Sequence, residues 1–267
     1  MQEIRAALTY IPPVDGPRVT LVGVPGVPLV RPGDDLPTVV VDALNRAGLR
    51  PEADDVVVVT SKIVSKAEGR VVDLRTVVPS ARAHELAAIT EKEPELVELV
   101  LRESTDVVRA VPGVLLVRHR LGFMSANAAI DRSNVDGSDH TALLMPVDPD
   151  ASAARVKRAL DDAFGDGIGV LVTDTHGRPF RRGNIGVAVG VAGFEPVVDM
   201  IGDHDLFGRE LKATIVPLGD EIAAAAALVS GETSEGLPIV LVRGVRLRPA
   251  HGGTDELLFP PDRDLFA

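Results

Sequence analysis

Short runs of β-branched and aliphatic residues alternate along the chain with longer segments whose apolar residues recur at helical spacing. A short continuous apolar run is typical of a buried strand, and a 3.6-residue period is typical of an amphipathic helix. The runs predict strands at residues 18–24, 55–60, 114–117, 168–173 and 239–242. The amphipathic segments predict helices at residues 80–89, 94–103, 151–164 and 221–229, and a further helix starting near Pro37.

Polar residues at the predicted helix starts indicate how these helices are capped. Ser80 is the expected N-cap of the first helix, and Asp150 or Ser152 that of the third. Asp34 is the expected cap of the helix near Pro37. The chain has no internal repeat, and its pattern fits an α+β or α/β protein with two interleaved lobes. We predict the α+β class, with mixed sheets and helices in one unit over residues 1–267 and a C-terminal tail at 245–267.

Composition narrows the function classes. The chain has 267 residues, a net charge of −11, no Trp and a single Tyr. Its core must be aliphatic, and nucleic acid is not an expected partner, because phosphate neutralisation needs a basic face. The absence of cysteine excludes disulfides and thiolate chemistry. No apolar run approaches the roughly 18 residues of a membrane span, and the first residues lack a signal-peptide layout, so we expect a cytoplasmic protein with no membrane partner.

The stretch VTDTHGRPFRRGNIG, residues 172–186, carries the first candidate chemistry. Asp174 and Thr175 stand just past a predicted strand end, and their oxygens suit Mg²⁺ or Mn²⁺. Arg178, Arg181 and Arg182 follow, and their guanidinium groups can hold a phosphate or a carboxylate. A metal beside arginines would suit a phosphate chain. The alternative is a surface turn with a capping aspartate and solvated arginines.

Two further segments combine polar side chains in the same way. Residues 60–70, TSKIVSKAEGR, offer hydroxyls and lysines after a strand, which can hold phosphates or can simply be a solvated helix start. They lack the glycines of a P-loop. Residues 125–137, SANAAIDRSNVDG, contain Asp131, which could share a metal with Asp174 or could be a turn residue with an Asx hydrogen bond. The six histidines have no zinc-site spacing.

Taken together, several segments resemble one known family. In chain order they are GVPLVRPGDDL, VVVVTSKIVSKAEGR, NAAIDRSN, LMPVDPDASA, VTDTHGRPFRRG, DLFGREL, DEIAAAA and PIVLVRG. The chain closely resembles the coenzyme F420-0:L-glutamate ligases, or gamma-glutamyl ligases, over residues 20–244. These occur as free-standing proteins and as the N-terminal half of two-domain actinobacterial enzymes.

The resemblance implies a GTP-dependent ligase that joins L-glutamate to the phospholactate carboxylate of F420-0 through an acyl phosphate. Later glutamates would be added through γ-linkages. It also implies a homodimer that uses two divalent cations, Mg²⁺ or Mn²⁺, with K⁺ supporting activity. Two functions from other classes remain open on the residues alone: a metal-dependent nucleotide hydrolase or phosphotransferase, and a non-catalytic nucleotide-binding protein.

Matching motifs carry site residues over from the family. The residues expected to border the nucleotide are Gly26, Val27, Pro28, Leu29, Ser61, Lys62, Lys66, Asn134 and the segment from Leu228 to Glu235. Asp131 and Asp174 match the ligands of one metal, and Thr175 and Glu232 those of the second. We expect Asp131, Asp174, Arg178 and Arg181 to serve catalysis.

Two departures from the family pattern are visible. The family commonly has glycine where this chain has Ala129, in the run Asn-Ala-Ala-Ile-Asp. The extra methyl group matters if that backbone needs a positive φ. Relatives also differ at the position of Glu232.

Overall fold

The larger lobe is built on a five-stranded sheet. The computed structural model describes residues 16–250 and 252–259. The strand order is β1 (Thr20–Gly23), β12 (Ile239–Arg243), β2 (Val56–Thr60), β8 (Gly169–Arg178) and β9 (Arg181–Ala192). Only β2 and β8 run parallel, and the other neighbours are antiparallel. Mixed sheets with separate helices confirm the α+β class.

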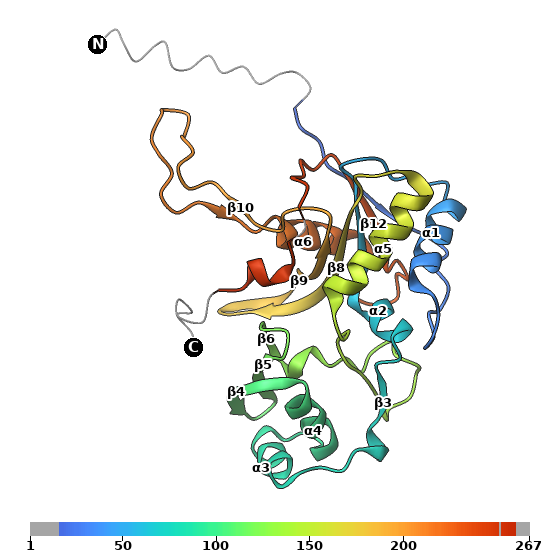
Figure 1. The fold of residues 1–267 in the computed structure, drawn as a ribbon. Coiled ribbons are helices and arrows are strands. Elements are labelled where there is room, and N and C mark those ends of the chain that lie inside the picture. The colour runs from blue at the N-terminus through green and yellow to red at the C-terminus, as the bar shows by residue number, and fades with distance from the viewer. Residues whose placement is uncertain (1–15, 251, 260–267) are drawn as a thin grey trace.

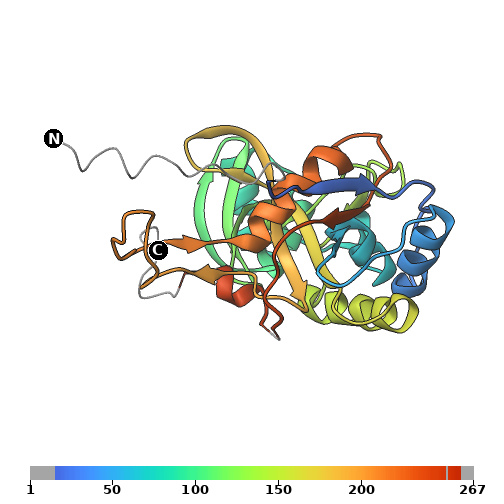
Figure 2. The same cartoon turned by 90° about the horizontal axis from the view of Figure 1, so that it is seen from above.

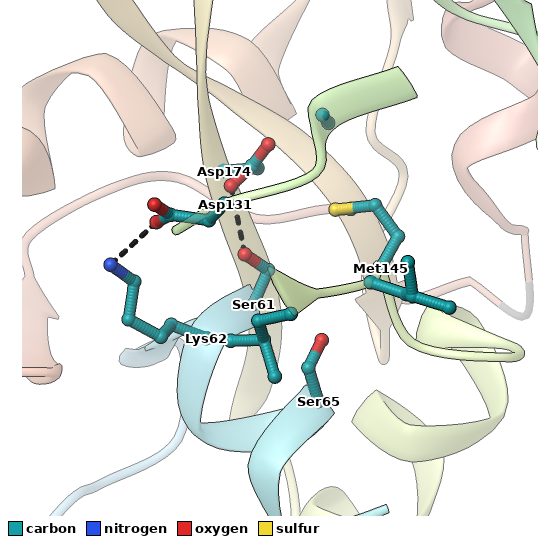
Figure 3. Close-up of a pocket in the computed structure, with 9 residues that line it drawn as sticks. Ser61, Lys62, Ser65, Asp131, Met145 and Asp174 are labelled. Carbon is teal, nitrogen blue, oxygen red and sulfur yellow. Dashed lines mark hydrogen bonds and ion pairs between the residues drawn. The ribbon is translucent and has the colours of Figure 1, made fainter. Parts of the chain in front are cut away.

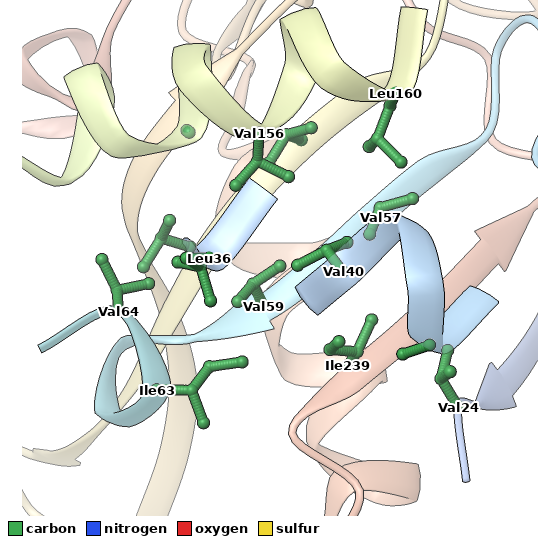
Figure 4. Packing of buried hydrophobic residues seen from close by; sticks show 14 of the residues in the cluster. Val24, Leu36, Val40, Val57, Val59, Ile63, Val64, Val156, Leu160 and Ile239 are labelled. Atoms are coloured by element: carbon green, nitrogen blue, oxygen red, sulfur yellow. The ribbon is translucent and has the colours of Figure 1, made fainter. Parts of the chain in front are cut away.

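The valine run of β2 is continuous because both of its faces are buried. Val57 and Val59 pack into a core with helices α1 (Leu36–Arg46) and α5 (Pro149–Phe164), shown in Figure 4. Val56 and Val58 pack on the opposite face with α6 (Leu218–Ser230). Since successive side chains of a strand point to opposite faces, one run supplies both cores.

The smaller lobe is an insertion between helix α2 (Ser61–Ala67) and α5, below the large sheet in Figure 1. Its helices pack on one face of a three-stranded sheet, and a two-stranded ladder adjoins them. These elements are β3 (Val71–Asp73), η1 (Leu74–Thr76), α3 (Ala81–Thr90), α4 (Pro94–Arg102), β4 (Ser104–Val111), β5 (Val114–His119), β6 (Met124–Ala126), η2 (Asn127–Ala129) and β7 (Thr141–Leu143). The chain leaves the larger lobe and returns to it, so the lobes are interleaved.

Two segments extend the larger lobe. Strands β10 (Val198–Asp199) and β11 (Ile215–Val216) pair at the base of an arm that projects from the body (Figures 1 and 2). The short helix η3 (Thr254–Leu257) contacts β9, and the Thr254 hydroxyl lies 3.1 Å from a carboxylate oxygen of Asp150. Part of the predicted tail therefore packs on the body, while residues 251 and 260–267 lie outside the described residues.

The helix caps correct part of the sequence interpretation. Ser80 caps α3 as expected, accepting from the Ala83 amide at 3.2 Å. Helix α5 is capped by Asp148, not by Asp150 or Ser152, because Pro149 can occupy the first helical position. Asp34 does not cap α1: the N-cap is the next residue, and Asp34 accepts from the Arg31 amide.

The prediction that a strand ends at residue 173 was wrong. Strand β8 continues to Arg178 and turns directly into β9, so Asp174 and Thr175 lie within a β-hairpin, opposite Val187 and Gly186. The ladder hydrogen bonds to β9 hold the backbone extended after the apolar run has ended.

Among the helices of the described residues, none has the length and apolar character that crossing a bilayer requires.

Candidate functional site

A polar pocket lies where the two lobes meet. Its lining comes from α2, the segment after β6, the end of β7 and β8 (Figure 3). The lining residues are Ser61, Lys62, Ser65, Ala129, Asp131, Leu143, Leu144, Met145 and Asp174. The pocket brings together Ser61, Lys62, Asp131 and Asp174, four residues that the sequence places on three separate segments.

The parallel pairing of β2 and β8 positions the first contact. Thr60 is in register with Thr173, so the residues that follow them, Ser61 and Asp174, meet at the same sheet edge. The Ser61 hydroxyl donates to Asp174 Oδ1 at 2.8 Å. Helix α2 starts directly at Ser61, and Ser61 is buried in the pocket wall. The segment is therefore more than a solvated helix start.

Asp131 is fixed by its backbone and by two donors. Its amide and carbonyl pair with Leu143, and its Oδ1 accepts from the Ser133 amide at 2.7 Å in an Asx turn. Lys62 Nζ lies 2.5 Å from Oδ2. Burial raises the pKa of Asp131, but the hydrogen bonds from Lys62 and Ser133 outweigh it and the net pKa is lowered. The residue is both the predicted turn residue and an ionised group facing the pocket.

Lys66 and Asn134 connect the pocket to the loop after α6. Lys66 Nζ donates to the Asn134 carbonyl at 2.7 Å, and the Asn134 amide donates to the Thr233 carbonyl at 2.8 Å. The Glu235 carboxylate accepts from the Thr233 amide. Burial and the neighbouring Lys62 lower the pKa of Lys66, although Asp136 and Asp131 oppose this. Three distant segments thus share one hydrogen-bonded chain.

His176 is a site residue that the sequence analysis missed. Its Nε2 lies 3.0 Å from Asp174 Oδ2, and its ring packs against Phe123 with centroids 4.8 Å apart. Asp174 and His176 are two apart in a strand, so their side chains share a face. A longer predicted strand would have shown this pairing.

Several predicted residues lie outside the pocket lining. The loop of Gly26, Val27, Pro28 and Leu29 follows β1, with Leu29 85% exposed. Leu228 is exposed on α6, and Arg178 and Arg181 face each other at the hairpin turn. Glu232 is exposed in the loop after α6.

The turn before Asp131 is left-handed. Asn127, Ala128 and Ala129 have φ of 52°, 53° and 52°. L-residues other than glycine and asparagine rarely adopt this region, because Cβ crowds the backbone. The backbone at Ala129 therefore has the positive φ that would explain a glycine there in relatives.

The donor set fits one divalent cation in the pocket. Asp131 and Asp174 are hard oxygen ligands from different segments, and Mg²⁺ commonly binds one or two carboxylates together with substrate phosphates and water. No group of three or more His, Asp or Glu side chains converges within the described part of the chain. Thr175 is in register with Gly186, where a Cβ would meet α6, so its side chain lies on the sheet face opposite to Asp174. Its pairing with Glu232 in a second metal site stays a prediction.

The fold and the pocket define an α+β protein whose lobes bring together hydroxyls, a lysine and two carboxylates, a set suited to an anionic ligand with a cation. Comparison with known proteins specifies this class further. A family model described as F420-0:Gamma-glutamyl ligase matches residues 26–244, and the chain belongs to this family. It is a ligase of coenzyme F420 biosynthesis.

Archaeal relatives match the chain along nearly its whole length. The coenzyme F420:L-glutamate ligase of Methanothermobacter thermautotrophicus is 45% identical over 251 residues, covering 93% of this chain and 98% of the relative. The protein of the same name from Archaeoglobus fulgidus is 42% identical, covering 93% and 96%. That from Methanopyrus kandleri is 42% identical, covering 89% and 93%.

Proposed function

We propose that the protein uses GTP to ligate L-glutamate to F420-0 through an acyl phosphate, and then extends the chain through γ-linkages. Membership of the ligase family supports the substrates F420-0 and glutamate. The hydrogen bonds that connect Lys66, Asn134 and Thr233 support the nucleotide part of the proposal. They link three segments of the protein whose residues match the family's nucleotide contacts.

The chemistry has two transfers. A carboxylate oxygen of F420-0 attacks the γ-phosphorus of GTP, and the bond to the bridging oxygen breaks to release GDP. The glutamate amine, having lost a proton, then attacks the acyl carbon, and inorganic phosphate leaves with the electrons of the C–O bond. Both steps develop negative charge on oxygen, which preorganised cationic groups stabilise.

The chain's own residues divide these tasks. Lys62 and Lys66, with the Gly26–Leu29 loop, would contact GTP, and Ser61 orients the Asp174 carboxylate through its 2.8 Å hydrogen bond. Asp131 and Asp174 would hold a Mg²⁺ or Mn²⁺ ion, which neutralises phosphate charge when bound. A second divalent ion at Thr175 and Glu232, K⁺ as a supporting ion and a homodimer complete the proposal.

Mass spectrometry of F420-0 incubated with GTP, Mn²⁺ and glutamate tests the proposal. The expected products are F420 species heavier by one or more glutamate residues, with one GDP and one phosphate formed for each glutamate consumed. Replacing GTP with ATP or omitting Mn²⁺ should suppress the products. Release of GDP and phosphate without glutamate consumption would favour a nucleotide hydrolase instead. GTP binding without turnover would favour a non-catalytic nucleotide-binding protein.

A further inference from the structure

The tip of the β8–β9 hairpin carries an aromatic side chain that the fold does not need. Pro179 and Phe180 form the turn between Arg178 and Arg181, and the Phe180 side chain is 99% exposed. Its φ is 59°, whereas the second central position of such turns usually takes glycine or asparagine. A bulky residue at positive φ is strained, and here no burial offsets the strain.

Ion pairs within the described residues do not explain the two guanidinium groups beside Phe180. Arg178 and Arg181 are directly opposite each other, and like charges in that arrangement are destabilising. No carboxylate in residues 16–250 or 252–259 pairs with either of them; Arg178 Nη2 donates to the Arg182 carbonyl at 3.5 Å, and its Nε is buried without a hydrogen-bond partner. An aromatic ring between two uncompensated cations matches a ligand that is both flat and anionic.

The hairpin leads from this tip into the pocket. Strand alternation places Asp174, His176 and Arg178 on one face of β8, and the 3.0 Å contact of His176 with Asp174 agrees with this. Arg178 lies four positions after Asp174 along the strand, which corresponds to about 13 Å. F420-0 has its reacting carboxylate at one end, then a phosphodiester and a ribityl chain, and a flat deazaflavin ring at the other end.

We propose that the hairpin tip is the subsite for the distal part of F420-0. Phe180 stacks on the deazaflavin ring and Arg181 flanks that ring, while the phosphodiester and the adjoining substrate carboxylate lie toward the pocket, where Arg178 and Asp174 share one face of β8. This inference rests on the proposed function, since it takes F420-0 as the substrate. It assigns the strained turn a binding role.

The test is binding of F420-0, followed by its intrinsic fluorescence and anisotropy, with the full chain and no nucleotide. Phe180→Gly removes the ring and relieves the backbone, so we expect the melting temperature to hold or rise while Kd for F420-0 increases about tenfold, as for loss of a base–aromatic stack. Phe180→Tyr should keep wild-type affinity. Arg181→Lys should also weaken binding, because it keeps the charge but loses the planar fork.

The matched control is Phe207→Ala, which removes another exposed phenylalanine from the β10–β11 arm. It should leave F420-0 affinity unchanged. Wild-type Kd and KM for F420-0 in Phe180→Gly would overturn the subsite. So would a loss of GTP affinity alone, or dissociation of a dimer without a change in F420-0 affinity per chain. Failure of the proposed function is a separate result: the wild-type protein itself would then make no glutamylated product.

Discussion

The ammonium group of Lys62 lies 2.5 Å from Oδ2 of Asp131. Lys62 belongs to helix α2 of the larger lobe, whereas Asp131 follows η2 in the smaller lobe. This ion pair therefore joins the lobes across the pocket. It also places a positive charge where a divalent cation bound to Asp131 would stand. Lysine and cation compete for the same carboxylate unless phosphates of a bound nucleotide draw the lysine away.

Lys62→Ala should consequently strengthen binding of Mn²⁺ alone while weakening binding of GTP. Removing a unit charge beside the carboxylate removes Coulomb repulsion of the incoming ion, and a severalfold lower Kd for Mn²⁺ is expected. Titration of Mn²⁺ without nucleotide measures the first effect, and GTP titration the second. Lys157→Ala, which breaks the ion pair with Asp161 on α5, is the matched control and should change neither. An unaltered Mn²⁺ affinity in Lys62→Ala would remove Asp131 from the metal site.

Asp174→Asn tests the other carboxylate of the pocket. Asparagine keeps one oxygen that can accept from Ser61 but loses the charge, so the fold should persist. Ligation should fall to background. The rise in melting temperature that Mn²⁺ and GTP together confer on the wild-type protein should disappear, because that rise reports binding to the folded state. Asp161→Asn on α5 serves as the control with wild-type turnover. Normal turnover in Asp174→Asn would refute the metal assignment.

Local pattern predicted the framework of this fold, but not the contacts across it. The valines of β2 identify a buried strand because each face has its own core. The end of β8 was misjudged because its last residues are polar and are held in the strand by pairing with β9, which the apolar pattern alone does not reveal. The same error concealed His176, whose relation to Asp174 needs a continuous strand.

The motif SKAEGR looks uniform in sequence, but its charged residues have different roles in the structure. In SKAEGR, Lys66 donates to the Asn134 carbonyl, whereas Glu68 accepts from the Val147 amide and the Ser152 hydroxyl to anchor the start of α5. Arg70 pairs with the buried Glu103 and donates to the Met145 carbonyl. Composition cannot separate binding residues from residues that fix the lobes together, because both tasks use the same charged side chains.

Ala129→Gly should stabilise the protein slightly. Ala129 has a φ of 52°, where Cβ is strained and glycine is not. The gain is reduced because glycine also increases the entropy of the unfolded chain, so about 0.5–1 kcal/mol of added unfolding free energy is expected. Denaturant unfolding measures it. Ala154→Gly, inside helix α5, is the control and should destabilise by a similar amount. A loss of stability in Ala129→Gly would mean that the methyl group packs usefully against the core.

His119 should make stability depend on pH. Its ring is fully buried and stacks on Phe123, and this burial, with the nearby Arg120, lowers its pKa from 6.5 to about 4 despite the opposing charge of Glu103. Below pH 6.5, His119 is protonated in the unfolded chain but stays neutral in the folded protein. The neutral His119 ring therefore contributes fully to the free energy of unfolding above pH 6.5. This contribution is lost as the pH falls to about 4, by about 3 kcal/mol in total.

His119→Asn should remove this slope, because asparagine does not titrate and its side-chain oxygen can replace Nδ1 as acceptor for the Leu121 amide. The variant loses the ring stack and will be less stable at pH 7.5, so the readout is the change in unfolding free energy between pH 7.5 and pH 5, not its absolute value. His84→Asn replaces an exposed histidine on α3 and should keep the wild-type slope. If His119→Asn keeps that slope too, the acid sensitivity arises elsewhere, because only a group that binds protons differently in the two states can produce it.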